Sequence, residues 1–295
     1  MSEFQLSCCS AADLSDEYFK ERDIRYICFH FEIDGEDFLD DMGQTIPPEE
    51  LFRRMDGGAM TRTSQVSIGE YENFFREILA SGSDLLHVTL SSGLSGTYNA
   101  AKIAAENVSE EYPERKICVM DSLAASSGFG LLVDKLADMR DEGLSIEEVF
   151  AWGQKNKLYD HHWFFSTDLT YYIRGGRVSK TAGTIGNVLN ICPLLNVDFE
   201  GHLIPREKVR TKKRVIKRTV EKMAEHAEGG YEYDGKVFIS HSLCPDDAKV
   251  LADAIEEKFT KIVRPIRIFP IGATIGSHTG PGTVALFFWG DKRAD

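Results

Sequence analysis

The sequence lacks any hydrophobic run long enough to cross a membrane and any cysteine motif typical of a metal site. The longest apolar runs, 85–90 and 284–289, are far shorter than the roughly 20 residues that a spanning helix needs. The six cysteines include no Cys-x-x-Cys pair and no ligand-like spacing with the eight histidines. We therefore expect no integral membrane association, no metal site, and reduced thiols that are mostly buried.

The first ten residues also lack the positive and apolar regions of a secretory signal, which favours a cytoplasmic protein. Positive charge is scarce overall, because 47 acidic residues outnumber 34 basic ones and give a net charge of -13. Such a surface repels phosphate backbones, so no nucleic-acid partner is expected. The exception is the segment 206–218, which contains eight basic residues and only one acidic residue, Glu207. A solvated helix face and a docking or anion-binding surface explain this run equally well.

At 295 residues the chain exceeds the size at which one hydrophobic core usually stops growing, so two domains are expected. Short apolar runs alternate with helical patterns over 1–160, which is typical of a parallel sheet with helices on both faces. Over 161–295 a hairpin signal at Glu200 and Gly201 favours a mixed sheet. The predicted fold class is α/β, with an N-terminal three-layer α/β/α domain (1–160) and a C-terminal two-layer domain (161–295).

Individual elements are predicted from the same patterns. The strands expected in the first half are 4–7, 26–31, 85–90 and 117–120. Those expected in the second half are 162–166, 192–197, 202–209, 236–241, 266–271 and 283–289. Ser67 with Glu70, and Ser145 with Glu148, match the capping box that begins a helix. Further helices are expected at 169–173, 211–228 and 246–259.

The segment 85–106 combines an apolar strand, a loop rich in serine and glycine, and an amphipathic helix that begins near Thr97. Free N–H groups and the positive end of the helix dipole favour a negatively charged group at such a helix start. The loop hydroxyls that could add hydrogen bonds are Ser91, Ser92, Ser95 and Thr97. Simple capping by Ser95 or Thr97 explains the segment equally well, so both interpretations stay open at this point.

Three other polar segments are expected to be loops. Residues 61–67 are rich in small hydroxyls, 175–179 place two glycines beside Arg177, and 276–282 hold His278 among three glycines. A histidine in a glycine-rich loop can titrate near neutral pH and contact an anion. A lone surface histidine explains the last pattern equally well.

Two enzyme classes are disfavoured by the spacing of residues in the serine-rich loop. Residues 93–97 read Gly-x-Ser-Gly-x instead of the Gly-x-Ser-x-Gly of a nucleophile elbow, and no histidine can be assigned as the base. No Gly-Lys-Ser/Thr follows these glycines, so the loop is not a Walker phosphate loop.

Taken together, four motifs make the sequence resemble the DegV family. They are TSQVS at 63–67, SSGLSGTY at 91–98, GGRVS at 175–179 and HTGPGT at 278–283. A basic segment, KVRTKKR, lies between the last two at 208–214. All of these segments occur in the order that is typical of the family.

The resemblance implies a DegV-like fold and a protein that binds a long-chain fatty acid, with the acyl chain buried in a tunnel. By motif, Thr63 and Ser95 would hydrogen-bond the carboxylate. Weaker roles in ligand binding or phosphate placement would fall to Ser64, Gly96, Arg177, Arg210 and His278. The implied partner is a fatty acid kinase, which would convert the bound acid to an acyl phosphate. The chain itself would need no catalytic residue and no cofactor.

The sequence departs from the family pattern at three positions. Cys9 replaces the first acidic residue of an Asp-Ser-x-Ala-Asp-Leu motif, Val66 replaces the proline of TSQPS, and Cys192 stands where lysine is common. These departures bear on chain-length preference and on coupling to a kinase. The alternative hypothesis is an autonomous enzyme on acyl or phosphorylated substrates that uses His278 as acid or base.

Overall fold

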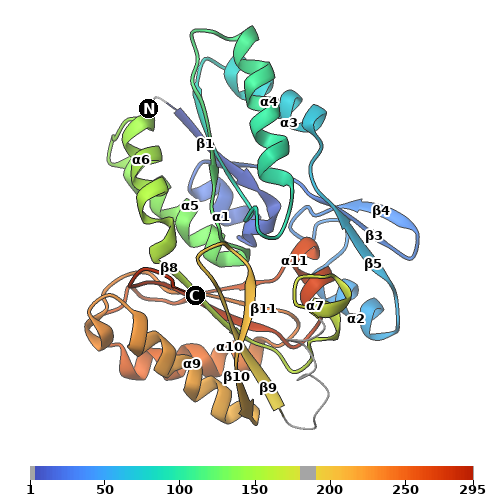
Figure 1. Ribbon diagram of the computed structural model, residues 1–295, viewed down its shortest axis with the longest axis vertical. Coiled ribbons are helices and arrows are strands. Elements are labelled where there is room, and N and C mark those ends of the chain that lie inside the picture. The colour runs from blue at the N-terminus through green and yellow to red at the C-terminus, as the bar shows by residue number, and fades with distance from the viewer. Residues whose placement is uncertain (1–3, 180–190, 295) are drawn as a thin grey trace.

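The computed structural model describes residues 4–179 and 191–294, and its first half forms a four-stranded parallel sheet in the order β2-β1-β6-β7. The strands are β1 (Phe4–Cys9), β2 (Ile24–Ile27), β6 (Asp84–Thr89) and β7 (Ile117–Asp121). Flanking helices include α1 (Asp16–Glu21), α3 (Ile68–Ala80), α4 (Thr97–Glu111), α5 (Ser126–Asp141) and α6 (Ile146–Asn156). Figure 1 shows α3 and α4 on one face of the sheet and α5 and α6 on the other. The predicted α/β/α arrangement is therefore confirmed.

The second half forms a six-stranded mixed sheet in the order β10-β9-β8-β13-β11-β12. The strands are β8 (Asp160–Phe165), β9 (Ile191–Val197), β10 (Leu203–Arg210), β11 (Phe238–His241), β12 (Arg267–Pro270) and β13 (Val284–Trp289). Helices α9 (Lys212–His226) and α10 (Pro245–Lys258) pack on this sheet, as does α5 from the first half. The predicted hairpin is present as β9 and β10, and its turn holds Gly201 at a φ of 80°.

Both halves share one large hydrophobic core, because α5 contacts the parallel sheet and the mixed sheet. The same core contains Leu86 of β6 and Phe287 of β13. Strand β8 begins at Asp160, and a domain boundary at that position stays a prediction. No helix in the described parts of the chain is both long and apolar enough to span a membrane.

A small antiparallel sheet, in the order β4-β3-β5, corrects one predicted strand and one predicted loop. Its strands are β3 (His30–Ile33), β4 (Glu36–Leu39) and β5 (Thr61–Ser64). The single strand expected at 26–31 is wrong, because the chain leaves the parallel sheet after β2 and pairs elsewhere as β3. The loop expected at 61–67 is wrong for its first four residues, which form β5 by pairing with β3.

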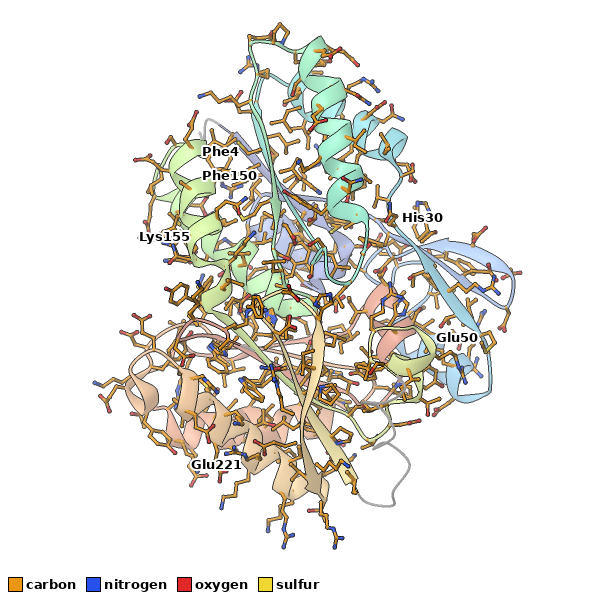
Figure 2. All side chains as sticks on the ribbon, in the orientation of Figure 1. Phe4, His30, Glu50, Phe150, Lys155 and Glu221 are labelled. Atoms are coloured by element: carbon orange, nitrogen blue, oxygen red, sulfur yellow. The ribbon has the colours of Figure 1, made fainter. Side chains whose placement is uncertain are left out.

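The signal for this sheet lies in the dipeptide Asp34-Gly35 between β3 and β4. Both residues have positive φ angles, 56° and 84°, as the two-residue type I′ hairpin turn requires. The sheet joins the parallel domain through His30 (Figure 2), whose Nε2 lies 2.6 Å from Oε1 of Glu70 on α3. Glu70 also completes the predicted capping box with Ser67.

Helix α11 (Ala273–Thr279) replaces the first half of the loop expected at 276–282, so that prediction is also wrong. Two buried carboxylates hold its start. Oδ1 of Asp13 accepts from the Gly272 N–H at 3.0 Å, and the oxygens of Asp40 accept from the N–H groups of Ala273 (3.0 Å) and Thr274 (3.1 Å). These bonds compensate for helix N–H groups that no preceding carbonyl can reach. The helix packs against β3 and β5, against α2 (Pro48–Asp56) and against α7 (Thr170–Arg174).

The basic run 206–218 is divided between β10 and α9, so it is not a single helix face as one interpretation required. Part of the positive charge of this run is paired with carboxylates on β10 and α9. Arg218 lies 2.8 Å from Oε1 of Glu207 and 2.6 Å from Oε1 of Glu225.

Replacing Asp40 should destabilise the protein, because Asp40→Ala leaves the first N–H groups of α11 buried and unpaired. We expect a loss of about 2–4 kcal/mol in the free energy of unfolding. Denaturant unfolding measures it, with Asp37→Ala on the exposed face of β4 as the matched control. A loss as small as that of the control would contradict the role assigned to Asp40.

Candidate functional site

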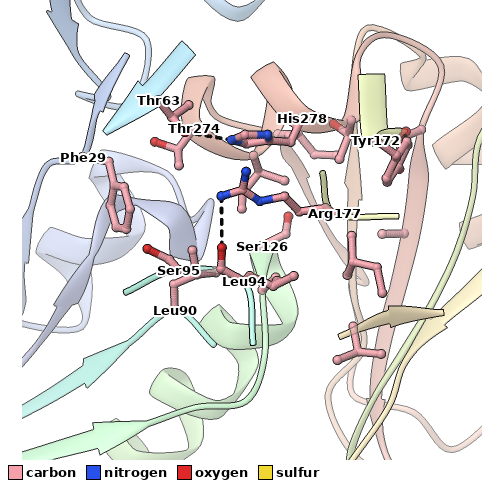
Figure 3. A pocket seen from close by; sticks show the side chains of 18 of the residues that line it. Phe29, Thr63, Leu90, Leu94, Ser95, Ser126, Tyr172, Arg177, Thr274 and His278 are labelled. Atoms are coloured by element: carbon pink, nitrogen blue, oxygen red, sulfur yellow. Dashed lines mark hydrogen bonds between the residues drawn. The ribbon is translucent and has the colours of Figure 1, made fainter. Parts of the chain in front are cut away.

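A cavity of about 470 Å³ lies between the parallel sheet, the small sheet, α11 and the mixed sheet. Its volume is within the roughly 300–1,000 Å³ typical of small-ligand sites. Most of the exposed area of the wall is apolar, and its apolar residues are Phe29, Leu90, Leu94, Ala125, Phe164, Val197, Leu203, Ile271, Ile275, Ala285 and Phe287. Polar side chains gather beside this wall in Figure 3.

The parallel sheet contributes the loops that follow its strands. Leu90 and Ser95 come after β6, and Ala125 comes after β7. These loops lie at the carboxyl ends of the strands, where open α/β sheets bind ligands. The predicted succession of strand, serine-rich loop and helix is therefore confirmed, and it places this loop at the edge of the cavity.

Thr63 and His278 meet at one side of the cavity, where β5 faces α11. Side chains alternate along β5, so Thr61 and Thr63 are half-buried while Arg62 and Ser64 are exposed. The Thr63 hydroxyl lies 2.7 Å from Nε2 of His278 (Figure 3). This bond joins a residue early in the chain to one near its end.

His278 is a neutral imidazole in this setting. Burial, and to a lesser extent the nearby charge of Arg177, lower its pKa from 6.5 to about 4. The expectation that it titrates near neutral pH is therefore wrong. The imidazole of His278 packs against Gly175, which has no side chain. A Cβ at position 175 would lie only 2.3 Å from Nδ1 of His278.

Arg177 brings a positive charge to the cavity, and no carboxylate of the described residues pairs with it. Its Nη2 donates to the carbonyl of Leu94 at 3.0 Å (Figure 3), and Nη1 donates to the carbonyl of Gly175 at 2.6 Å. Burial lowers the pKa of Arg177, and among the described residues no carboxylate forms an ion pair with it. A half-buried guanidinium held only by carbonyl dipoles favours an anionic group in the space beside it.

Ser95 is the one hydroxyl of its loop that lines the cavity. Ser91 instead donates to the carbonyl of Gly201 at 2.9 Å, and Thr97 shares a 2.7 Å hydrogen bond with the Tyr71 hydroxyl. The Ser95 oxygen accepts from the Thr97 N–H at 3.3 Å, which leaves its own hydrogen free to donate. The N-cap of α4 is Gly96, without a side-chain cap, so the simple capping interpretation is wrong, and a role of Ser95 in ligand binding stays a prediction.

The remaining predicted site residues fall into two groups. Ser64 and Gly96 line the cavity with Thr63, Ser95, Arg177 and His278. Arg210 does not, because it is exposed at the end of β10 and lines a separate surface groove with Lys208 and Arg214.

Comparison with known families and proteins shows what this chain is similar to. A family model described as "Uncharacterised protein, DegV family" matches residues 9–291. A DegV domain-containing protein from Clostridium perfringens is 38% identical over 293 residues, which cover 99% of each chain. The chain belongs to the DegV family.

Two solved structures extend this result to the fold. A DegV family protein from Thermus thermophilus, described by its fatty acid binding, is 26% identical with a TM-score of 0.85, over 98% of this chain and 100% of that one. The fatty acid kinase B3 protein of Streptococcus pneumoniae, loaded with linoleic acid, is 22% identical with a TM-score of 0.85. It covers 98% of this chain and 99% of its own, and its likeness concerns the fold alone. The DegV-like fold expected from the sequence is confirmed.

The three departures from the DegV pattern lie outside the cavity wall. Cys9, Val66 and Cys192 are all buried, and none of them lines the cavity. The thiol of Cys9 accepts from the Leu90 N–H at 3.3 Å, so it supports the loop that follows β6. All six cysteines are free thiols.

Several other polar residues of this DegV protein also line the cavity. Ser126, His162, Tyr172 and Thr274 lie outside the DegV motifs, whereas Gln65, Thr279 and Thr283 lie within them. The hydroxyls of Tyr172 and Thr283 bond each other at 2.9 Å. Strand alternation around Phe164 and Ala285 is the signal that could have assigned His162 to the same face.

Two groups of side chains in the described residues could hold a metal ion by proximity. They are His161, His226 and Asp291, and the exposed group Asp198, Glu200 and His202. None of the six lines the cavity. Hydrogen bonds within the first group, where Asp291 contacts both imidazoles, account for its arrangement.

The low pKa of His278 predicts a specific pH dependence of stability. The unfolded chain binds a proton at this residue below pH 6.5, whereas the folded protein does so only below about pH 4. The contribution of neutral His278 to the free energy of unfolding is therefore fully present above pH 6.5 and declines as the pH falls towards 4. Unfolding of His278→Gln, measured beside the wild type, should depend less on pH across this range; parallel curves would contradict the buried neutral imidazole.

Proposed function

We propose that this chain binds a long-chain fatty acid, with the carboxylate on Thr63 and Ser95 and the acyl chain against the apolar wall. One observation carries the proposal. Within one cavity, an apolar surface adjoins the hydroxyls of Thr63 and Ser95 and the guanidinium of Arg177, which forms no ion pair with a carboxylate of the described residues. A fatty acid has the same division into an anionic head and an apolar tail.

The hydrogen-bond directions suit a carboxylate. With Nε2–H of neutral His278 donating to the Thr63 oxygen, the Thr63 hydroxyl can donate onward to an anion. Ser95 has its hydroxyl hydrogen free for the same purpose. Each charge-assisted bond contributes about 1.5–3 kcal/mol and fixes which end of the ligand lies here.

The apolar wall would supply most of the affinity. Burial of about 14 methylene groups at ~0.8 kcal/mol each favours binding by roughly 11 kcal/mol before the cost of ordering the ligand. The fatty acid binding described for the Thermus thermophilus relative supports this part of the proposal.

We further propose that the bound acid is presented to a fatty acid kinase and that this chain is the non-catalytic partner. One support is the motif resemblance. The other is the set of residues around the proposed carboxylate position, Arg177, Ser64, Gly96 and His278, which would favour the negative charge of a forming acyl phosphate. Arg210 is exposed on β10 and lies outside the cavity wall, so the cavity gives no support to a role for it.

The alternative, an autonomous enzyme using His278, has weaker support. An acid–base histidine usually needs a pKa near the working pH and a group that orients its second nitrogen. Here the pKa is about 4, and Nδ1 of His278 has no hydrogen-bond partner among the described residues. Binding therefore fits the geometry better than turnover.

Protein purified from a lipid-containing host should carry a stoichiometric fatty acid that mass spectrometry identifies after extraction. The double variant Thr63→Val, Ser95→Ala should lose most of it, because both carboxylate donors are removed. Ser92→Ala, on the same loop but outside the cavity wall, is the control and should retain it. Empty wild-type protein that also ignores added fatty acids would refute the proposal.

The kinase partnership needs a separate test with a bacterial fatty acid kinase, ATP and Mg²⁺. His278→Ala should still carry its fatty acid but yield at least about tenfold less acyl phosphate, since a group beside the reacting head is lost. Acyl phosphate formed by the chain without the kinase would favour the enzyme alternative. Equal yields of acyl phosphate from the variant and the wild type would contradict a role of His278 in presenting the acid to the kinase.

A further inference from the structure

Gln65 is a polar residue of the cavity wall whose side chain has no partner in the described parts of the chain. It is exposed, and it lines the cavity together with Thr63 and Ser95. Its amide forms no hydrogen bond with any residue that the structure describes. Because the side chain is accessible, a ligand in the cavity can reach it. The two N–H groups of this amide are therefore available to an anion.

The backbone on both sides of Gln65 is held in place. Ser64 is the last residue of β5 and pairs with His30 of β3. Val66 is fully buried, and Ser67 begins the capping box of α3. The side chain of Gln65 thus extends from a fixed point, and mainly its own torsions lose freedom when a ligand binds.

The side chain of Gln65 reaches from the end of β5 to the start of α4. A Cβ added at Gly96 would lie 2.6 Å from Oε1 of Gln65 and 3.7 Å from Nε2, so the amide packs against Gly96 with its oxygen nearer. Gly96 directly follows Ser95, and Gln65 lies two residues after Thr63. The amide therefore connects the two segments that carry the proposed carboxylate donors.

The start of α4 favours an anion at the same place. Its N-cap residue, Gly96, has no side chain that could accept from the first N–H groups of the helix. Helix N–H groups and the positive end of the helix dipole favour a negatively charged group nearby. An anion at this helix start would lie beside the amide of Gln65, because that amide packs against Gly96.

We infer that Gln65 is a third hydrogen-bond donor to the ligand carboxylate and contributes to selectivity for a negatively charged head group. The inference rests on the proposed function. A carboxylate can accept about four hydrogen bonds, so an N–H of Gln65 adds to the hydroxyls of Thr63 and Ser95. A glutamine that only faces water would explain the exposure of Gln65, but not its packing against a glycine between the two donor segments.

The test compares palmitic acid with hexadecanol, which has the same number of carbon atoms but an uncharged head group. Displacement of a neutral fluorescent lipid from delipidated protein gives both dissociation constants. Gln65→Glu replaces the amide with a carboxylate of the same shape. It should weaken binding of palmitic acid at least about tenfold and change that of hexadecanol less than about twofold. Gln154→Glu, the same change on the exposed face of α6, is the control and should alter neither.

A second experiment asks whether Gly96 acts through Gln65. Gly96→Ala would place a methyl group against Oε1 and displace the amide, so binding of palmitic acid should weaken at least about threefold. In a Gln65→Ala background, the same change should have no further effect. Equal losses in both backgrounds would contradict a contact between the amide and the carboxylate.

The outcomes separate this inference from the proposed function. If the wild type binds palmitic acid, equal weakening of both ligands by Gln65→Glu, or weakening of neither, would overturn the role of Gln65 alone. Failure of the wild type to bind palmitic acid would overturn the proposed function and this inference together. Retained binding of hexadecanol by a variant shows that it is folded.

Discussion

The site depends on how the start of α11 is held. Asp13 and Asp40 come from loops after strands of two different sheets, and both accept hydrogen bonds from backbone N–H groups at the beginning of this helix. The helix in turn presents His278 to Thr63 of β5. A seven-residue helix has little stability of its own, so tertiary contacts of this kind must fix its position. The same carboxylates thus stabilise the fold and position the residues of the candidate site.

Charge is distributed unevenly around the cavity. Arg177 keeps a positive charge close to the hydroxyls of Thr63 and Ser95, while burial keeps His278 neutral. A neutral histidine can act as one link in a hydrogen-bond chain without adding a second positive charge that would need compensation. The apolar wall next to these groups lowers the local dielectric and strengthens their interaction with an anion.

The sequence predicted the large sheets well and the connecting parts poorly. Buried strands such as β6 contain short runs of apolar residues, and capping boxes at Ser67 and Ser145 mark helix starts, so local patterns suffice there. The small sheet depends on pairing between segments about thirty residues apart, and α11 depends on carboxylates from the first 40 residues. No local pattern reports such long-range contacts. For the same reason the motifs located Thr63, Ser95, Arg177 and His278 but not His162, because its place in the cavity wall depends on which face of β8 meets the cavity.

The central claim is that one cavity holds the carboxylate at Thr63 and Ser95 and the acyl chain along the mixed sheet. A crystal structure with a fatty acid that carries a terminal bromine tests it most directly, since anomalous scattering marks the tail. The account predicts carboxylate oxygens within hydrogen-bonding distance of both hydroxyls and bromine among the apolar side chains of the wall. Bromine beside Arg177, or a carboxylate bound outside this cavity, would contradict it.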